Sequence, residues 1–277
     1  MATLLVFAAI FAAATWGVVT LLGSRGIIHT NSCTAYLPDG SSYALTAEQA
    51  DNAALITAIA AQRQLPARAA TIALATARQE SRLENIDYGD RDSVGLFQQR
   101  PSQGWGTVEQ IMDPVYSTGA FYDALVKVPG YEDMEITEAA QIVQISAHPE
   151  AYSQHENMAR AFASALSGHS HAALTCDLAE IDQPDGDPLQ SVMARLERDF
   201  GSASGTVQDS VLTIDATAIL PHVSAETAAW SVGQWAVATA SVTEVTGVRV
   251  GDQEWTRGTR EWVTAATPAA AGTVLVW

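Results

Sequence analysis

Apolar residues spaced three or four positions apart predict that the first half of the chain is mainly helical. One helix begins at Thr46, a residue type that caps helix N-termini, and another runs from Pro66 to Glu80. Residues 34–45 surround the turn former Pro38-Asp39-Gly40, so we expect a polar loop there. Three further helices are predicted near residues 107–127, 137–147 and 149–167.

The second half of the chain mixes two periodicities. Helical spacing covers residues 189–200 and 225–240, and the second of these segments is apolar enough to be a buried helix. Strands are predicted at residues 207–214, 242–250, 253–257 and 273–277. The chain is therefore expected to be α+β, with a mainly helical domain followed by a small α+β domain.

Changes in composition divide the chain into four parts. Residues 1–32 contain a hydrophobic segment, residues 33–176 form the mainly helical domain, and residues 189–277 form the small α+β domain. Residues 177–188 are rich in turn formers and acidic side chains, which is typical of a linker.

The hydrophobic segment at residues 2–24 carries no charged side chain. As a helix it would span about 30 Å, enough to cross the hydrocarbon core of a membrane. It exceeds the usual apolar part of a signal peptide and lacks a clean cleavage site, so we favour an uncleaved anchor over a cleaved signal or a buried helix. Arg25 follows the segment, and the positive-inside rule alone would place the rest of the chain in the cytoplasm.

The two cysteines, Cys33 and Cys176, indicate the opposite compartment. Neither has the spacing of a redox or zinc motif. A disulfide between them would close a loop of about 140 residues and stabilise the fold by at most roughly 5 kcal/mol. Since such bonds persist outside the cytosol, we expect a protein on the outer face of the cell membrane, or a secreted one if the anchor is cleaved. Two free thiols in a cytosolic protein are the alternative.

The net charge of −17 narrows the choice of partner. An acidic surface disfavours nucleic acid and anionic membrane surfaces. An anionic glycan polymer would have to be held by hydrogen bonds and stacking, because charge attraction is absent. No motif in the sequence indicates a cofactor.

Glu80 is the strongest candidate for chemistry. It lies at the C-terminal end of a predicted helix, where the macrodipole favours the protonated carboxyl group. Apolar neighbours would raise its pKa further and make it a general acid near neutral pH. Cleavage of a glycosidic bond needs such an acid, because the leaving oxygen must receive a proton.

The motifs around Glu80 resemble those of the lysozyme-like soluble lytic transglycosylases, in particular a secreted actinobacterial group. The resemblance covers roughly residues 45–168 and includes Gln79-Glu80-Ser81 followed by Gly95-Leu96-Phe97-Gln98. It implies that Glu80 is the catalytic residue. Tyr152 is the candidate for a tyrosine that hydrogen-bonds near the glutamate, although Ser153 stands where the family usually has asparagine. The predicted substrate-binding residues are Ser81, Ser93, Gly95, Leu96, Phe97, Gln98 and Tyr152.

The resemblance implies cleavage of peptidoglycan between N-acetylmuramic acid and N-acetylglucosamine by a single glutamate. Asp87, Asp90 and Asp92 follow on the next loop and could instead activate water, which would make the protein a hydrolase; turn formation is their ordinary role. The alternative from another class is an inactive cell-wall binding or scaffold protein on the lysozyme fold.

The C-terminal part is similar to the latter part of zinc D-alanyl-D-alanine carboxypeptidase-like domains. The similarity covers Trp230 to Ala240 and Val248 to Trp255. That family holds zinc with an early His and Asp and a His-x-His on the last strand, but the predicted last strand at residues 272–277 contains no histidine. We therefore predict no metal site and a non-catalytic domain whose protein partner the sequence does not identify. Tryptophans at helical spacing are also simply core residues.

Overall fold

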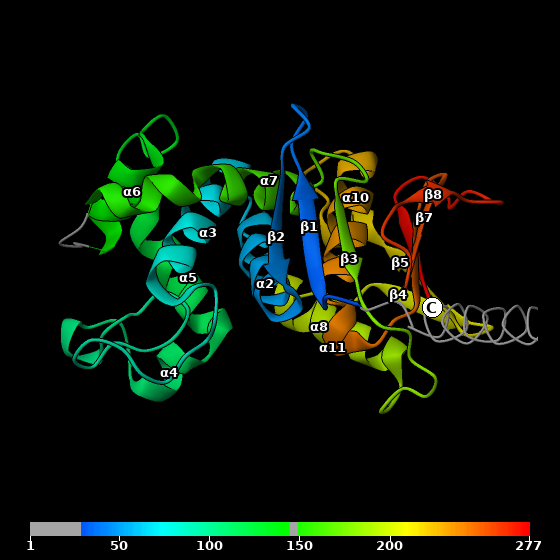
Figure 1. Cartoon of the computed structure of the whole chain (residues 1–277), viewed down its shortest axis with the longest axis horizontal. Helices are drawn as coiled ribbons and strands as arrows, with labels where there is room; N and C mark the ends of the chain where they lie inside the picture. Colours follow the sequence, from blue (N-terminus) through cyan, green and yellow to red (C-terminus); the bar gives the residue numbers. More distant parts are fainter. Residues whose placement is uncertain (1–28, 145–148) are drawn as a thin grey trace, which may run out of the picture. The chain divides into compact units, whose positions relative to one another are not determined.

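The computed structural model describes residues 29–144 and 149–277. The predicted anchor at residues 1–32 therefore lies almost wholly outside the described part of the chain. Within the described ranges, no helix is both long and apolar enough to cross a membrane. Residues 31–277 form one compact unit that mixes helices and sheets, as expected for an α+β protein (Figure 1).

The segment expected to be a polar loop is instead a β-hairpin, so that prediction was wrong. It belongs to a three-stranded antiparallel sheet of order β2-β1-β3. Cys33 and Ala35, two positions apart on the first strand, and Leu45 on the second strand are buried, which explains why the two strands pair against the core. The predicted turn does connect the two strands, with Gly40 in the left-handed region at φ 86°. The strands are β1 (Ser32–Tyr36), β2 (Ser42–Thr46) and β3 (Leu174–Asp177).

Helices that pack on one another form the body of the first region. Thr46 accepts a hydrogen bond from Gln49 N at 3.2 Å and caps α2 as predicted. The helix expected over residues 107–127 is divided at Asp113, which ends one helix and caps the next before Pro114. The helices are α2 (Ala47–Gln62), α3 (Ala67–Ser81), α4 (Val108–Met112), α5 (Pro114–Leu125), α6 (Ile136–Gln144) and α7 (Glu156–Leu166), with 3-10 turns η1 (Pro101–Gln103) and η2 (Pro149–His155).

A second, six-stranded antiparallel sheet of order β4-β5-β9-β6-β7-β8 occupies the C-terminal region. The expected strand at residues 207–214 is a hairpin, because Asp209 and Ser210 adopt positive φ. The expected strand at residues 242–250 begins only at Gly247, after a short helix. The strands are β4 (Gly205–Gln208), β5 (Val211–Asp215), β6 (Gly247–Val250), β7 (Gln253–Thr256), β8 (Val263–Thr264) and β9 (Thr273–Val276).

The helix α10 (Ala225–Ala238) contacts both the second sheet and the first region. Gly233 permits its approach to the sheet, since a Cβ there would lie 2.2 Å from Val250 Cγ2. On the other side, the buried Gln234 donates to Ala165 O at 2.6 Å and accepts from Leu174 N at 2.9 Å. The remaining helices of this region are α8 (Pro188–Phe200), α9 (Ala216–Ile219) and α11 (Ala240–Thr243).

A buried ion-pair network joins α2 to α8. Arg195 contacts Asp51 at 2.9 Å and Asp199 at 3.1 Å, and the Asp199 side chain is fully buried. Trp235 Nε1 donates to Asp199 at 2.9 Å. Burial raises the pKa of the Asp51 carboxyl group, although Arg195 opposes that effect.

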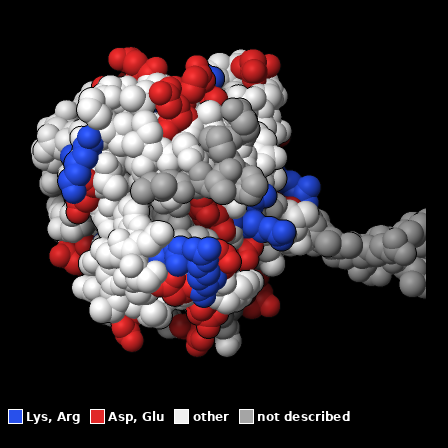
Figure 2. Space-filling model, turned by 90° about the vertical axis from the view of Figure 1, so that its left-hand side faces the viewer, with Lys and Arg blue, Asp and Glu red and all other residues white. Residues whose placement is uncertain are grey.

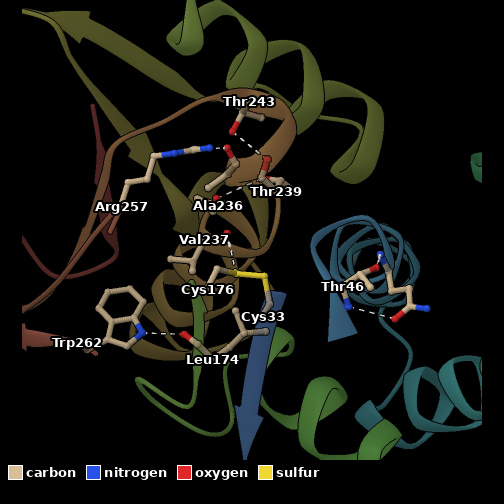
Figure 3. The surroundings of a disulfide bond; sticks show 12 residues. Cys33, Thr46, Leu174, Cys176, Ala236, Val237, Thr239, Thr243, Arg257 and Trp262 are labelled. Atoms are coloured by element: carbon tan, nitrogen blue, oxygen red, sulfur yellow. Dashed lines mark hydrogen bonds between the residues drawn. A yellow bond between two sulfur atoms is a disulfide. The ribbon is translucent and has the colours of Figure 1, made fainter. Parts of the chain in front are cut away.

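The disulfide between Cys33 and Cys176 is present, as predicted (Figure 3). The two cysteines face each other directly in the register of β1 and β3, and 143 positions separate them in the sequence. Nearby, Trp262 Nε1 donates to Leu174 O at 2.8 Å, which attaches the segment just before β8 to β3 (Figure 3).

Candidate active site

Glu80 is the second-last residue of α3. The helix ends there because Arg82 and Leu83 adopt left-handed backbone conformations, at φ 61° and 63°. Residues 69–77 of the same helix are buried, so the helix is held firmly up to the turn that carries the glutamate. Glu80 itself is half-buried.

Two neutral side chains hydrogen-bond to the Glu80 carboxyl group. Tyr152, from η2, donates its hydroxyl to Glu80 Oε1 at 2.6 Å. Gln144, the last residue of α6, makes the second hydrogen bond. Burial raises the pKa of Glu80 above its ordinary value, while the two hydrogen bonds act in the opposite direction. The result is a carboxyl group suited to carry a proton at a higher pH than an exposed glutamate does.

The Gly95–Gln98 motif forms a tight turn between two bridged residues, Val94 and Gln99. Gly95 has φ 78°, and a Cβ there would lie 2.8 Å from the carbonyl oxygen of Ile111. A side chain at this position is therefore excluded by both conformation and space. Phe97 is buried and stacks on Phe121 with ring centroids 4.6 Å apart.

The turn supports Glu80 through backbone groups. Ser81 Oγ donates to Leu96 O at 2.7 Å, and Gln144 Nε2 donates to Phe97 O at 2.8 Å. Gln144 therefore contacts both the turn and the glutamate. These hydrogen bonds fix the end of α3 against α6.

Most predicted substrate-binding residues are buried. The exposed fractions are 5% for Ser81, 7% for Ser93 and 0% for Leu96, Phe97 and Tyr152. Gln98 is partly exposed and donates to Tyr88 O at 3.2 Å. Of these residues, Tyr152 contacts Glu80 directly, whereas Leu96 and Phe97 are connected to the end of α3 through Ser81 and Gln144.

The loop aspartates differ from one another. Asp92 accepts hydrogen bonds from Arg100 Nε at 2.8 Å and Ser102 N at 2.8 Å, and these donors lower its pKa. Asp92 therefore connects the loop that follows α3 to the segment at residues 100–102. Asp87 and Asp90 are exposed.

The sequence did not predict the role of Gln144, nor a cluster of polar side chains next to Glu80 that consists of Gln79, Gln154 and His155. Gln79 accepts a hydrogen bond from Gln154 at 3.2 Å and lies 3.0 Å from His155 Nε2. Burial, assisted by the charge of Arg78, lowers the pKa of His155. The sequence signal for Gln144 was weak, because a glutamine at a helix end has many ordinary roles.

The face of the molecule shown in Figure 2 is mostly uncharged and carries both acidic and basic patches. Among the described residues, no group of three or more His, Cys, Asp or Glu side chains is arranged to hold a metal ion.

Comparison with family models finds no match for this chain, and comparison with curated proteins finds no significant similarity. Any functional assignment therefore depends on the motifs and on the geometry around Glu80.

Proposed function

We propose that this chain cleaves peptidoglycan glycan strands between N-acetylmuramic acid and N-acetylglucosamine, with Glu80 as its single catalytic residue. The observation that carries the proposal is the half-buried Glu80, which has a raised pKa and two neutral hydrogen-bond partners. The motif resemblance to lytic transglycosylases supports the same assignment. The disulfide supports an extracytoplasmic location, where peptidoglycan is found.

In this mechanism the proton of Glu80 passes to the glycosidic oxygen as its bond to C1 breaks. The substrate's N-acetyl group stabilises the positive charge that develops at C1. The Glu80 carboxylate then removes the proton of the C6 hydroxyl group, whose oxygen bonds to C1. Glu80 ends protonated, and the product is a 1,6-anhydro-muramoyl sugar. Tyr152 and Gln144 orient the carboxyl group by their hydrogen bonds.

Hydrolysis would replace the C6 hydroxyl group with water and would use a second carboxylate. Asp92 is poorly suited to that role, because Arg100 and Ser102 already engage its oxygens. Asp87 or Asp90 would have to act as the base.

A second candidate function is cell-wall binding without catalysis. The burial of Leu96 and Phe97 favours it, since side chains that hold the fold together would persist in an inactive relative. In that case Glu80 would be a structural residue.

The test is mass spectrometry of purified peptidoglycan after incubation with the full chain. Glu80→Gln keeps the size of the side chain and removes the proton donor. Glu138→Gln, an exposed glutamate in α6, is the matched control. Anhydro products from the wild type and the control, but not from Glu80→Gln, are the expected result.

Cleavage retained by Glu80→Gln would refute the assignment. Reducing-end products would replace transglycosylation with hydrolysis. Binding of glycan by all three proteins without any product would support the scaffold function.

A further inference from the structure

A cavity of about 260 Å³ lies in the C-terminal region and shares no lining residue with the Glu80 site. One wall is α10, which contributes Glu226, Ala229 and Trp230. The turn between β6 and β7, which includes Asp252, forms a second wall. The segment before β9 forms the third. The volume suits a single amino-acid side chain rather than a drug-sized molecule.

Backbone hydrogen bonds hold these walls in place. Ala265 N donates to Asp252 O at 2.8 Å, and Ala269 N donates to Gly251 O at 2.8 Å. Gly272 closes the segment at φ 76°, where a Cβ would lie 2.5 Å from Thr217 Cγ2. The second and third walls are therefore tied to each other by the main chain, so this side of the cavity is preformed.

The charged groups of the cavity are of one sign. Among the described residues that line it, Glu226 and Asp252 are charged and both are acidic, and they face it from different elements. Both side chains are exposed to solvent. The other lining residues are alanines, glycines, Val250 and Trp230. An anionic ligand would be repelled, whereas a cation with an apolar stem would match both properties.

Neighbouring rings hold Trp230 in its orientation. His171 stacks on it with centroids 5.1 Å apart and planes 9° from parallel, and Trp262 meets it edge-on at 5.2 Å. Glu226, one helical turn before Trp230, has Oε1 3.6 Å from His171 Nδ1. Trp230 therefore gives the cavity a fixed apolar surface close to the carboxylate of Glu226.

We propose that this cavity binds the alkylammonium side chain of a lysine-type residue in a peptide. The methylene stem lies against Ala229, Val250 and the edge of Trp230. The ammonium group lies between the carboxylates of Glu226 and Asp252 and donates hydrogen bonds to both. This site is independent of the proposed glycan cleavage.

The test is calorimetric titration of the full chain with Nα-acetyl-lysine amide. The comparison ligand is Nα-acetyl-norleucine amide, which lacks only the amino group. The expected result is saturable binding of the lysine probe with a dissociation constant of about 1 mM, and binding of the norleucine probe that is weaker by about tenfold. Added salt should weaken the lysine complex.

The double variant Glu226→Gln/Asp252→Asn should bind the lysine probe about tenfold more weakly. Glu197→Gln/Asp209→Asn changes two exposed acids elsewhere and is the matched control for net charge. Glu80→Gln should bind the probe as the wild type does, so failure of the glycan proposal would leave this one untouched. Equal binding of both probes, unchanged binding by the double variant, or no binding up to about 10 mM would overturn the proposal.

Discussion

Two regions of the molecule each withdraw a carboxyl group from water, and they surround it with different neighbours. In the helical region, Glu80 has neutral partners, Tyr152 and Gln144. At the junction of α2 and α8, Asp51 shares the guanidinium group of Arg195 with Asp199. Burial raises the pKa of both Glu80 and Asp51.

The difference lies in what each carboxyl group can do with its proton. Asp51 is attached to a cation, so its charge is used in holding two helices together. Glu80 has no such cation among its described partners and can exchange a proton without breaking an ion pair. Whether a carboxyl group with a raised pKa is reactive therefore depends on its neighbours, and a paired cation argues for a structural role.

The largest expected effect concerns the ion-pair network. Arg195→Met should lower the free energy of unfolding by about 3–5 kcal/mol, because it leaves the buried carboxylate of Asp51 without its cation and removes one of the two cations that contact Asp199. Urea denaturation measures the loss. Arg198→Met is the matched control: that side chain is 39% exposed although it lies 2.7 Å from Asp199, and its removal should cost only about 1 kcal/mol. Equal losses in the two variants would contradict the structural role assigned to Arg195.

Tyr152→Phe tests the neutral surroundings of Glu80. Loss of the hydrogen bond should raise the pKa of Glu80 further and cost about 1 kcal/mol of stability. The rate of glycan cleavage falls as a general acid loses its proton, so the alkaline limb of the rate–pH profile should move to higher pH.

Tyr122→Phe is the matched control for that experiment. Tyr122 is buried and donates to Ile56 O at 3.0 Å, so its variant should lose similar stability without moving the alkaline limb. If both variants shift the limb alike, Tyr152 acts on the fold and not on Glu80.

The smallest expected effect is on stability as a function of pH. A carboxyl group whose pKa is raised by folding contributes stability below its unfolded value, here 4.5, and loses that contribution as pH rises through the folded pKa. Glu80→Gln should therefore become more stable relative to the wild type by about 1 kcal/mol or less over that window. Asp51 is present in both proteins, so its pH-dependent contribution cancels in the difference between their stabilities. A difference that does not change with pH would show that Glu80 titrates normally.

Local sequence signals predicted the elements with strong periodicity. The helix that carries Glu80, the helix over residues 188–200 and the strands β7 and β9 lie close to their expected positions. The hairpin of β1 and β2 was missed because each strand has only five residues and because β1 also pairs with β3 from far along the chain. Non-local pairing of that kind leaves little trace in a sequence window.

The candidate site was predictable only in part. The resemblance proposed Tyr152 near the glutamate, and the structure contains that hydrogen bond; the catalytic role of both residues stays a prediction. Gln144 could not be assigned, because its reach to Phe97 O depends on how α6 packs on α3. The burial of Leu96 and Phe97 also followed from packing and not from the motif.

The disulfide determines how the chain responds to proteolytic cleavage. Cys33 precedes the helices around Glu80 and Cys176 follows them, so the bond makes this stretch a covalent ring. A protease that cuts one exposed loop inside the ring opens it without releasing a fragment. The two parts of the chain on either side of the cut stay covalently joined through Cys33 and Cys176, and the pairing of β1 with β3 also remains. Two cuts, or one cut and a reductant, would be needed to separate the parts.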